Sequence, residues 1–190
     1  MKRVAFLLFF AAFLIPLAHA QTEVGAYGDY LHLSQTHTNL AGLGLRLGVP
    51  VVPHIKFEGE ISYDFEQTFT EGFTDTSNGA LFVQRSNIRA LHGLFGPTVE
   101  LGFSRFHPFV TLKGGFLNTR FDTAPATVGT FISSIQNLRS QDVSAVLYPG
   151  GGIEGRIGPI GLRLDLGDEM YFNGGTHHNF RAAFGPYIHF

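Results

Sequence analysis

The sequence predicts an all-β fold, an eight-stranded antiparallel up-and-down transmembrane β-barrel, on three observations. Residues 54–66 alternate apolar and polar side chains without a break, which indicates a strand with two opposed faces. Tight turns alternate with long polar connections along the chain. No segment after residue 20 is long and apolar enough for a membrane helix, so a membrane form would have to be a closed sheet.

The amino-terminal residues 1–20 have the pattern of a secretory signal peptide. Lys2 and Arg3 precede an apolar run, and Ala18 and Ala20 form a small-x-small cleavage site. An uncleaved membrane anchor is the alternative, but the run is short for a spanning helix and contains Pro16. We therefore expect a signal peptide at 1–20 and an outer-membrane β-barrel domain at 21–190.

Composition narrows the function classes. The signal holds two of the 13 basic residues and none of the 15 acidic ones, so 11 basic and 15 acidic residues remain, a formal charge of −4. That balance gives no support to nucleic-acid binding. The chain has no cysteine, so neither disulfides nor thiolate metal sites hold it together. Tryptophan is also absent, which leaves the interfacial aromatic girdles to phenylalanine and tyrosine.

Eight strands are expected in chain order. They are residues 23–34, 40–51, 54–66, 87–103, 108–121, 143–157, 160–172 and 179–190. The face of the first strand is ambiguous, because Tyr27 and Tyr30 fall on opposite parities. In the other strands most apolar residues share one parity and most charges share the other, although Arg89 falls on the apolar parity near the loop end, where a long side chain can snorkel. Pro50 and Pro53 mark one tight turn, and the Gly-Pro pair at 158–159 marks another.

The connections separate a membrane barrel from a soluble one. Residues 67–86 and 122–142 read as long polar loops, whereas the connections at 35–39, 104–107 and 173–178 are shorter. Loops of about twenty residues are uncommon in a compact soluble domain but typical of the extracellular side of a small outer-membrane barrel. A soluble carrier barrel of the lipocalin kind remains the alternative, although nothing in such a barrel requires short turns to alternate with long polar loops.

The carboxyl-terminal strand ends on an aromatic residue. Phe184, Ile188 and Phe190 share its apolar face. We expect these residues to form the signal that the barrel assembly machinery reads. The alternative interpretation is an ordinary edge strand with an exposed final phenylalanine.

Three segments resemble the family of outer-membrane β-barrel domain proteins, porin-like or OmpA-like eight-stranded barrels. Residues 90–116 read ALHGLFGPTVELGFSRFHPFVTLKGGF, residues 148–165 read YPGGGIEGRIGPIGLRLD, and residues 179–190 read NFRAAFGPYIHF. The resemblance covers most of the chain after the signal, and its motifs are structural. It implies a fold and an outer-membrane location in a Gram-negative bacterium, and it carries no catalytic residues.

If the apolar parity faces lipid, the polar parity encloses an interior network of both signs, in which ion pairs can form across neighbouring strands. The expected members are Arg46, Lys56, Glu58, Glu60, Asp64, His92, Glu100, Lys113, Glu154, Arg156, Arg163, Asp165 and Arg181. Eight strands leave only enough space for side chains to fill. We therefore expect a solid polar interior, with a narrow ion path as the alternative.

The remaining motifs give little support to chemistry. Gly150, Gly152 and Gly155 match the dinucleotide spacing GxGxxG, but no helix follows, so we expect these glycines to make space inside a strand. His177 and His178 lie near Asp168 and Glu169, yet neighbouring residues of an extended chain point to opposite faces, which makes joint metal ligation awkward.

The sequence therefore predicts a non-enzymatic integral outer-membrane protein whose polar loops serve adhesion, host contact or envelope integrity. Its expected surroundings are outer-membrane lipid and lipopolysaccharide, it is expected to be a monomer, and no cofactor, metal or nucleic acid is implied. One alternative is a lipid-modifying enzyme such as a lipid A deacylase, for which Ser133, Ser134 and His178 are conceivable members although no spacing selects them. The other is a soluble secreted carrier barrel.

Overall fold

The computed structural model describes residues 22–34, 37–75, 79, 81–102, 106–121, 131–133 and 142–190. Nine strands follow one another, namely β1 (Glu23–Leu33), β2 (Thr38–Val52), β3 (Ile55–Asp75), β4 (Leu81–Glu100), β5 (Phe106–Phe121), β6 (Phe131–Ser133), β7 (Asp142–Ile157), β8 (Ile160–Phe172) and β9 (Thr176–His189). Within these residues, a search finds no helix with the length and apolarity that membrane crossing requires. The expected signal peptide lies outside the described residues.

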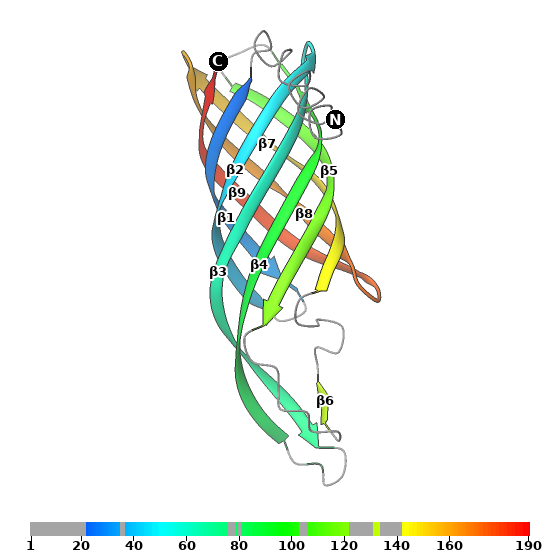
Figure 1. Ribbon diagram of the computed structural model, residues 1–190. Coiled ribbons are helices and arrows are strands. Elements are labelled where there is room, and N and C mark those ends of the chain that lie inside the picture. Colours follow the sequence, from blue (N-terminus) through cyan, green and yellow to red (C-terminus); the bar gives the residue numbers. More distant parts are fainter. Residues whose placement is uncertain are drawn as a thin grey trace, which may run out of the picture.

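Eight of the strands close into one barrel. All pairings are antiparallel, and the order around the barrel is β2-β1-β9-β8-β7-β5-β4-β3, with β3 pairing back to β2 (Figure 1). The first and last barrel strands are neighbours, from Glu23 beside His189 to His32 beside Phe180. The eight-stranded up-and-down fold is confirmed. The short β6 is an addition that pairs with the far end of β3.

The two ends of the barrel differ. The tight β2–β3 and β7–β8 turns and both terminal strands meet at one end, here called the turn end, which is uppermost in Figure 1. There the His189 amide donates to the Pro159 carbonyl at 2.8 Å. Gly158, with a φ of 64°, allows the β7–β8 turn its left-handed conformation. The ends of β1, β3, β5 and β8 and the beginnings of β2, β4, β7 and β9 lie at the opposite end, here called the loop end.

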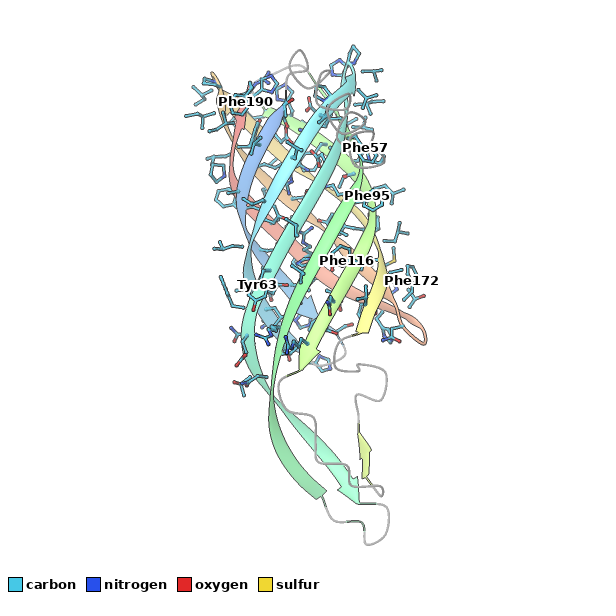
Figure 2. All side chains as sticks on the ribbon, in the orientation of Figure 1. Phe57, Tyr63, Phe95, Phe116, Phe172 and Phe190 are labelled. Atoms are coloured by element: carbon cyan, nitrogen blue, oxygen red, sulfur yellow. The ribbon has the colours of Figure 1, made fainter. Side chains whose placement is uncertain are left out.

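Alternation along each strand decides which side chains point inward. On β3, Phe57 and Ile61 expose 47% and 50% of their surface, whereas Glu58 between them exposes none. Because successive residues of a strand face opposite sides, exposed apolar residues alternate with buried polar residues along the barrel wall. Figure 2 shows Phe57, Phe95 and Phe116 pointing away from the barrel. The apolar parity therefore forms the outer surface and the charged parity forms the interior.

The structure also settles the face of β1. Tyr27 points inward with 4% exposure, and Tyr30 points outward with 39% exposure. Inside, the Arg46 guanidinium lies 4.9 Å from the centre of the Tyr27 ring. Outside, the Tyr30 hydroxyl donates to Asn39 Oδ1 at 3.0 Å. Asp29 therefore belongs to the interior.

The interpretation of residues 67–86 as an irregular loop was wrong. β3 continues to residue 75 and β4 begins at residue 81, and the two pair in register from Gln67 with Ile88 to Thr74 with Leu81. The abundant threonine and phenylalanine of this segment are good strand formers, and cross-strand pairing satisfies the backbone groups of a polar sequence. We call residues 67–88 the β3–β4 ribbon; it extends beyond the barrel in Figure 1.

Smaller differences occur at other strand ends. β4 ends at Glu100 rather than 103, and β9 begins at Thr176 rather than 179. Of the expected loop 122–142, the structure describes the backbone of β6 and the first residue of β7, while 122–130 and 134–141 lie outside the described residues.

Candidate functional site

The middle of the barrel holds a lattice of buried ion pairs centred on Glu58. Arg163 donates to both of its carboxylate oxygens, from Nη1 at 2.5 Å and from Nη2 at 3.0 Å. Lys113 Nζ lies 2.9 Å from Glu58 Oε2, and the Thr98 hydroxyl donates to the same oxygen at 2.8 Å. Four donor atoms from β4, β5 and β8 therefore converge on one fully buried carboxylate of β3.

Glu60 forms the second node of this lattice. Arg46 Nε donates to its Oε1 at 2.5 Å, Lys113 contacts the same oxygen, and Arg181 Nη1 donates to Oε2 at 3.0 Å. Asp165 completes the lattice, because it accepts from Arg163 Nη2 at 2.9 Å and from the Tyr148 hydroxyl at 2.6 Å. Charge-assisted bonds of this kind hold strands that are not neighbours in the sheet.

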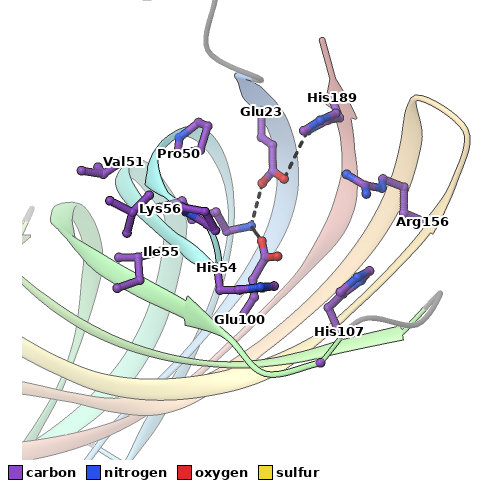
Figure 3. A pocket seen from close by; sticks show the side chains of 13 residues that line it. Glu23, Pro50, Val51, His54, Ile55, Lys56, Glu100, His107, Arg156 and His189 are labelled. Atoms are coloured by element: carbon purple, nitrogen blue, oxygen red, sulfur yellow. Dashed lines mark hydrogen bonds and ion pairs between the residues drawn. The ribbon is translucent and has the colours of Figure 1, made fainter.

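A cluster around Lys56 closes the turn end. Lys56 Nζ lies 2.7 Å from Glu23, 2.8 Å from Glu154 and 3.1 Å from Glu100. Figure 3 shows Glu23 and Glu100 reaching this ammonium and Glu23 also contacting His189. A cavity of about 620 Å³ opens above them, with Arg156, His54 and His107 among its lining residues. This mouth has charges of both signs beside apolar residues such as Val51 and Ile55, and the cluster forms its floor.

At the loop end the interior is apolar, which differs from the polar interior that the sequence predicts. Buried apolar side chains point inward from the ends of the strands and pack together as an apolar layer. Its members include Leu31, Leu33, Leu40, Ile88, Leu117, Val146 and Tyr171. These side chains lie on the inward parity of their strands. They therefore pack against one another inside the barrel and do not face lipid. The lattice and the apolar layer occupy successive levels of the interior, which in an eight-stranded barrel is only about wide enough for side chains.

Between the lattice and the apolar layer lies a cluster of Asp29, Asp64, His92 and Glu169. Arg181 Nε donates to Asp29 Oδ1 at 3.0 Å and to Oδ2 at 3.1 Å. His92 Nδ1 lies 2.9 Å from Glu169 Oε2. All four members are buried, and Asp64, His92 and Glu169 expose no surface.

The structure places the residues of the expected network as follows. Eleven are buried in the interior, namely Arg46, Lys56, Glu58, Glu60, Asp64, His92, Lys113, Glu154, Arg163, Asp165 and Arg181. Glu100 and Arg156 are partly exposed at the mouth of the turn end. Phe184, Ile188 and Phe190 point outward with 56%, 46% and 72% exposure, and the Phe190 amide donates to the Thr22 carbonyl at 3.0 Å.

Sequence reasoning left Asp29, Glu169, Asn179 and Tyr27 out of the interior network, although these residues are buried there. Asp29 and Tyr27 lie on the strand whose parity was ambiguous. Glu169 shares the parity of Arg163 and Asp165, so extending that alternation to the end of β8 would have found it. Asn179 shares the parity of Arg181 in the same way.

The glycines of β7 make room for large interior rings. A Cβ atom at Gly150 would lie 2.7 Å from a ring carbon of Tyr148, and one at Gly152 would lie 2.7 Å from the Phe109 ring. The Arg163 guanidinium lies 3.8 Å from the centre of that same Phe109 ring. These contacts explain the first two positions of the GxGxxG match as spaces for neighbouring side chains.

The other candidate residues do not converge in the described part of the chain. The His177 ring stacks on Tyr171 with 4.9 Å between centroids, whereas His178 Nδ1 lies 2.5 Å from Asp168 Oδ2 at the surface. Ser133 lies in β6, but its side chain and all of Ser134 fall outside the described residues.

The outer surface is apolar over the barrel wall. Leu43, Leu45 and Leu47 of β2 expose 62%, 61% and 45% of their surface, and similar residues follow on every barrel strand. A continuous apolar belt of this size has no stable place in water. It matches the lipid-facing band of a transmembrane barrel.

Comparison with known proteins identifies the fold. No protein-family model matches the chain, and no curated protein sequence matches it. Among solved structures, Neisserial surface protein A is similar with a TM-score of 0.52 at 10% identity, over 90% of this chain and 97% of that one. Ail of Yersinia pestis, solved in complex with the heparin analogue sucrose octasulfate, gives 0.51 at 12% identity over 90% and 97%.

Outer membrane protein W of E. coli gives a TM-score of 0.50 at 14% identity, over 90% of this chain and 98% of that one. At these identities the likeness concerns the fold alone. With the apolar belt and the enclosed charges, it leads to one conclusion. The chain has the fold and the lipid-facing surface of an eight-stranded Gram-negative outer-membrane β-barrel.

Proposed function

We propose that this chain is a non-enzymatic integral protein of the outer membrane that binds a protein partner outside the cell through the β3–β4 ribbon. The barrel is the anchor, its turn end faces the periplasm, and its loop end faces outward. This proposal assigns the role in adhesion or surface contact to one element rather than to the loops in general.

The extension of the ribbon beyond the barrel carries the proposal. β2 pairs with β3 as far as Asp64, and β5 pairs with β4 from Ile88 onward, so the outer parts of β3 and β4 pair with each other. Eight paired positions at about 3.3 Å each extend the ribbon by about 25 Å. A ribbon of two long strands, joined at its far end by the three-residue β6, adds little stability of its own. We therefore assign the ribbon the role of presenting a binding surface at a distance from the membrane.

The sequence of the ribbon favours a protein partner over a polyanion. Residues 67–86 contain Glu71 and Asp75 against Arg85, a slight negative excess. Ail was solved with a heparin analogue, but this ribbon lacks the basic excess that such a ligand requires. The segment also contains Phe69, Phe73 and Phe82, a composition that suits contact with a protein, and extended strands can add a partner strand at their edges.

The filled interior supports an anchor rather than a channel or an enzyme. The Glu58 lattice occupies the middle of the barrel, and the apolar layer closes the loop end. The cavity at the turn end has its floor at the Lys56 cluster. None of these features presents a nucleophile and base pair in the described residues. We therefore expect unchanged lipid A masses when the protein is expressed, as mass spectrometry of extracted lipid A would show.

A ribbon deletion tests the proposal. Replacing residues 69–86 by Asn-Gly keeps the Thr68 and Asn87 pair and closes it with a two-residue turn. Bacteria that display this variant should lose most of their adherence to cultured epithelial cells, relative to the full chain at equal surface amounts. A second variant with the ribbon sequence shuffled controls for general stickiness.

Two results would contradict the proposal. Equal adherence of the deletion variant and the full chain would show that the ribbon binds nothing relevant. Equal adherence of the shuffled variant would show that the contact is unspecific. Heat-modifiable migration on a gel confirms in each case that the barrel has folded.

Export and assembly complete the proposal. Residues 1–20 act as the signal peptide, and the barrel assembly machinery recognises the final strand through Phe184, Ile188 and Phe190. The protein then remains a monomer in lipid and lipopolysaccharide. The outward position of these three side chains supports this role. Phe190→Ala should lower the folded amount in the outer membrane while leaving the stability of refolded protein nearly unchanged.

A further inference from the structure

Asp64 is a buried carboxylate whose two oxygens both lack a hydrogen-bond donor in the described part of the chain. At the turn end, the Lys56 ammonium lies among Glu23, Glu100 and Glu154 and neutralises a cluster of three carboxylates. Asp64 is equally enclosed, with no exposed surface, yet neither of its oxygens accepts a hydrogen bond of good geometry from the described residues. A buried charge without a partner costs considerable free energy. The site therefore suits a further cation.

His92 turns one ring nitrogen toward Asp64 and Asp29. Its Nδ1 lies 2.9 Å from Glu169 Oε2, and because an ionised carboxylate can only accept, Nδ1 is the donor. Nε2 lies 3.1 Å from Asp29 Oδ2 and 3.3 Å from Asp64 Oδ2, without the geometry of a hydrogen bond. A histidine that donates one ring nitrogen to a carboxylate and holds the other, without a hydrogen bond, among further carboxylates has the arrangement of a metal-bound histidine.

The spacing of the three groups fits a small metal ion. Ligand atoms about 2.0–2.1 Å from zinc, at tetrahedral or octahedral angles, lie about 3.0–3.4 Å from one another. The two measured separations from His92 Nε2 fall in that interval. One ligand atom of each of Asp29, Asp64 and His92 lies within 4.8 Å of the others.

The charges of the cluster fit a divalent ion. Asp29, Asp64 and Glu169 carry three negative charges, and Arg181, which donates to Asp29, carries one positive charge. With His92 neutral, as metal binding requires, and with Arg181 shared with Glu60, the cluster has an excess of at least two negative charges, which a divalent cation offsets. An imidazole ligand favours zinc-like transition metals over calcium and magnesium, which prefer oxygen ligands alone.

We propose that Asp29, Asp64 and His92 bind one divalent transition-metal ion of the zinc class inside the barrel. The ion would join β1, β3 and β4, while Glu169 of β8 orients His92 and Arg181 of β9 orients Asp29. Because the site lies between the charged lattice and the apolar layer, the ion enters during folding and serves structure. This proposal does not depend on the role of the β3–β4 ribbon.

Zinc content measured on protein without a histidine tag tests the proposal. The full barrel is refolded in detergent with Zn²⁺, passed over a gel-filtration column in metal-free buffer, and analysed by inductively coupled plasma mass spectrometry. We expect close to one zinc ion per chain. Asp64→Asn and His92→Gln should each lower the retained zinc about tenfold or more, and Glu169→Gln should weaken the affinity about 10- to 100-fold.

A surface histidine provides the matched control. His178→Gln removes the exposed pair with Asp168 and should leave the zinc content unchanged. Cobalt bound in place of zinc should show visible absorption bands that Asp64→Asn alters. Migration of unheated samples on a gel shows whether each variant has folded. If His92→Gln does not fold, Asp64→Asn still tests the site, because asparagine has nearly the same shape as aspartate.

Three results would overturn the proposal. The first is wild-type protein that elutes without zinc. The second is zinc content that Asp64→Asn and His92→Gln leave unchanged. The third is zinc that His178→Gln removes, which would place the ion at the surface.

Discussion

Neutralising Glu58 should destabilise the barrel more than any other change to a single carboxylate of the lattice. Arg163, Lys113 and Thr98 all contact this side chain, which exposes no surface. Glu58→Gln keeps the volume and one acceptor oxygen, but it removes the charge that Arg163, Lys113 and, at 3.6 Å, Lys56 share. It also turns an amide N–H₂ group toward those cations. The variant therefore isolates the charge from the packing.

The expected loss follows from the burial of the partners. Removing one member of a buried ion pair costs about 3–5 kcal/mol, because the other charge stays buried without compensation. With a denaturant dependence of about 2 kcal/mol per molar urea, the unfolding midpoint should fall by about 2 M. The chain has no tryptophan, so unfolding in lipid vesicles is best followed by the gel migration of unheated samples.

Glu66 supplies the control for this prediction. It lies on the same strand, is exposed, and accepts from Asn87 Nδ2 at 2.7 Å. Glu66→Gln should change the free energy of unfolding by no more than about 0.5 kcal/mol. If Glu58→Gln were as mild as this control, the lattice would not contribute to stability in the way described.

Three further predictions follow from the outer surface, the packing and the filled interior. Leu45→Arg, at the middle of β2, should cost about 2–4 kcal/mol in lipid, whereas Val52→Arg at the strand end should cost about 0–1 kcal/mol; equal costs in urea titrations would argue against a lipid-facing belt. Gly152→Val should destabilise the barrel by about 1–3 kcal/mol, since a Cβ there meets the Leu164 carbonyl and the Phe109 ring, whereas Gly59→Val, with open space around it, should be tolerated in the same assay. Purified protein in planar bilayers should show no stable conductance, and reproducible single-channel steps would mean that the interior is open.

The sequence predicts the barrel well because alternation has a direct physical cause. Each side chain of a strand faces either lipid or the enclosed interior, so one charged residue such as Glu58 sets the face of its whole strand. Where amphipathic residues occur on both parities, as with Tyr27 and Tyr30, alternation alone gives no answer. There the neighbouring strands decide, through contacts such as the Arg46 guanidinium over the Tyr27 ring.

Other features depend on contacts between distant strands. A polar, threonine-rich sequence such as residues 67–86 becomes a ribbon because its two halves pair with each other, which composition does not reveal. Leu31 and Ile88 are buried inside because the loop end of the barrel is packed with apolar side chains rather than charges. The meeting of Asp29, Asp64 and His92 requires the closure of the barrel, which brings β1, β3 and β4 together across its interior.

Lipid exposure along β3 tests the central claim most directly. Because the chain has no cysteine, single cysteines can be placed at each position from 55 to 64 and labelled with a nitroxide in reconstituted vesicles. The account predicts that labels at odd positions, beginning with 55 and 57, collide with oxygen dissolved in the lipid, and that labels at even positions are immobilised and shielded. Shielded odd positions with oxygen-accessible even positions, or no alternation at all, would contradict it.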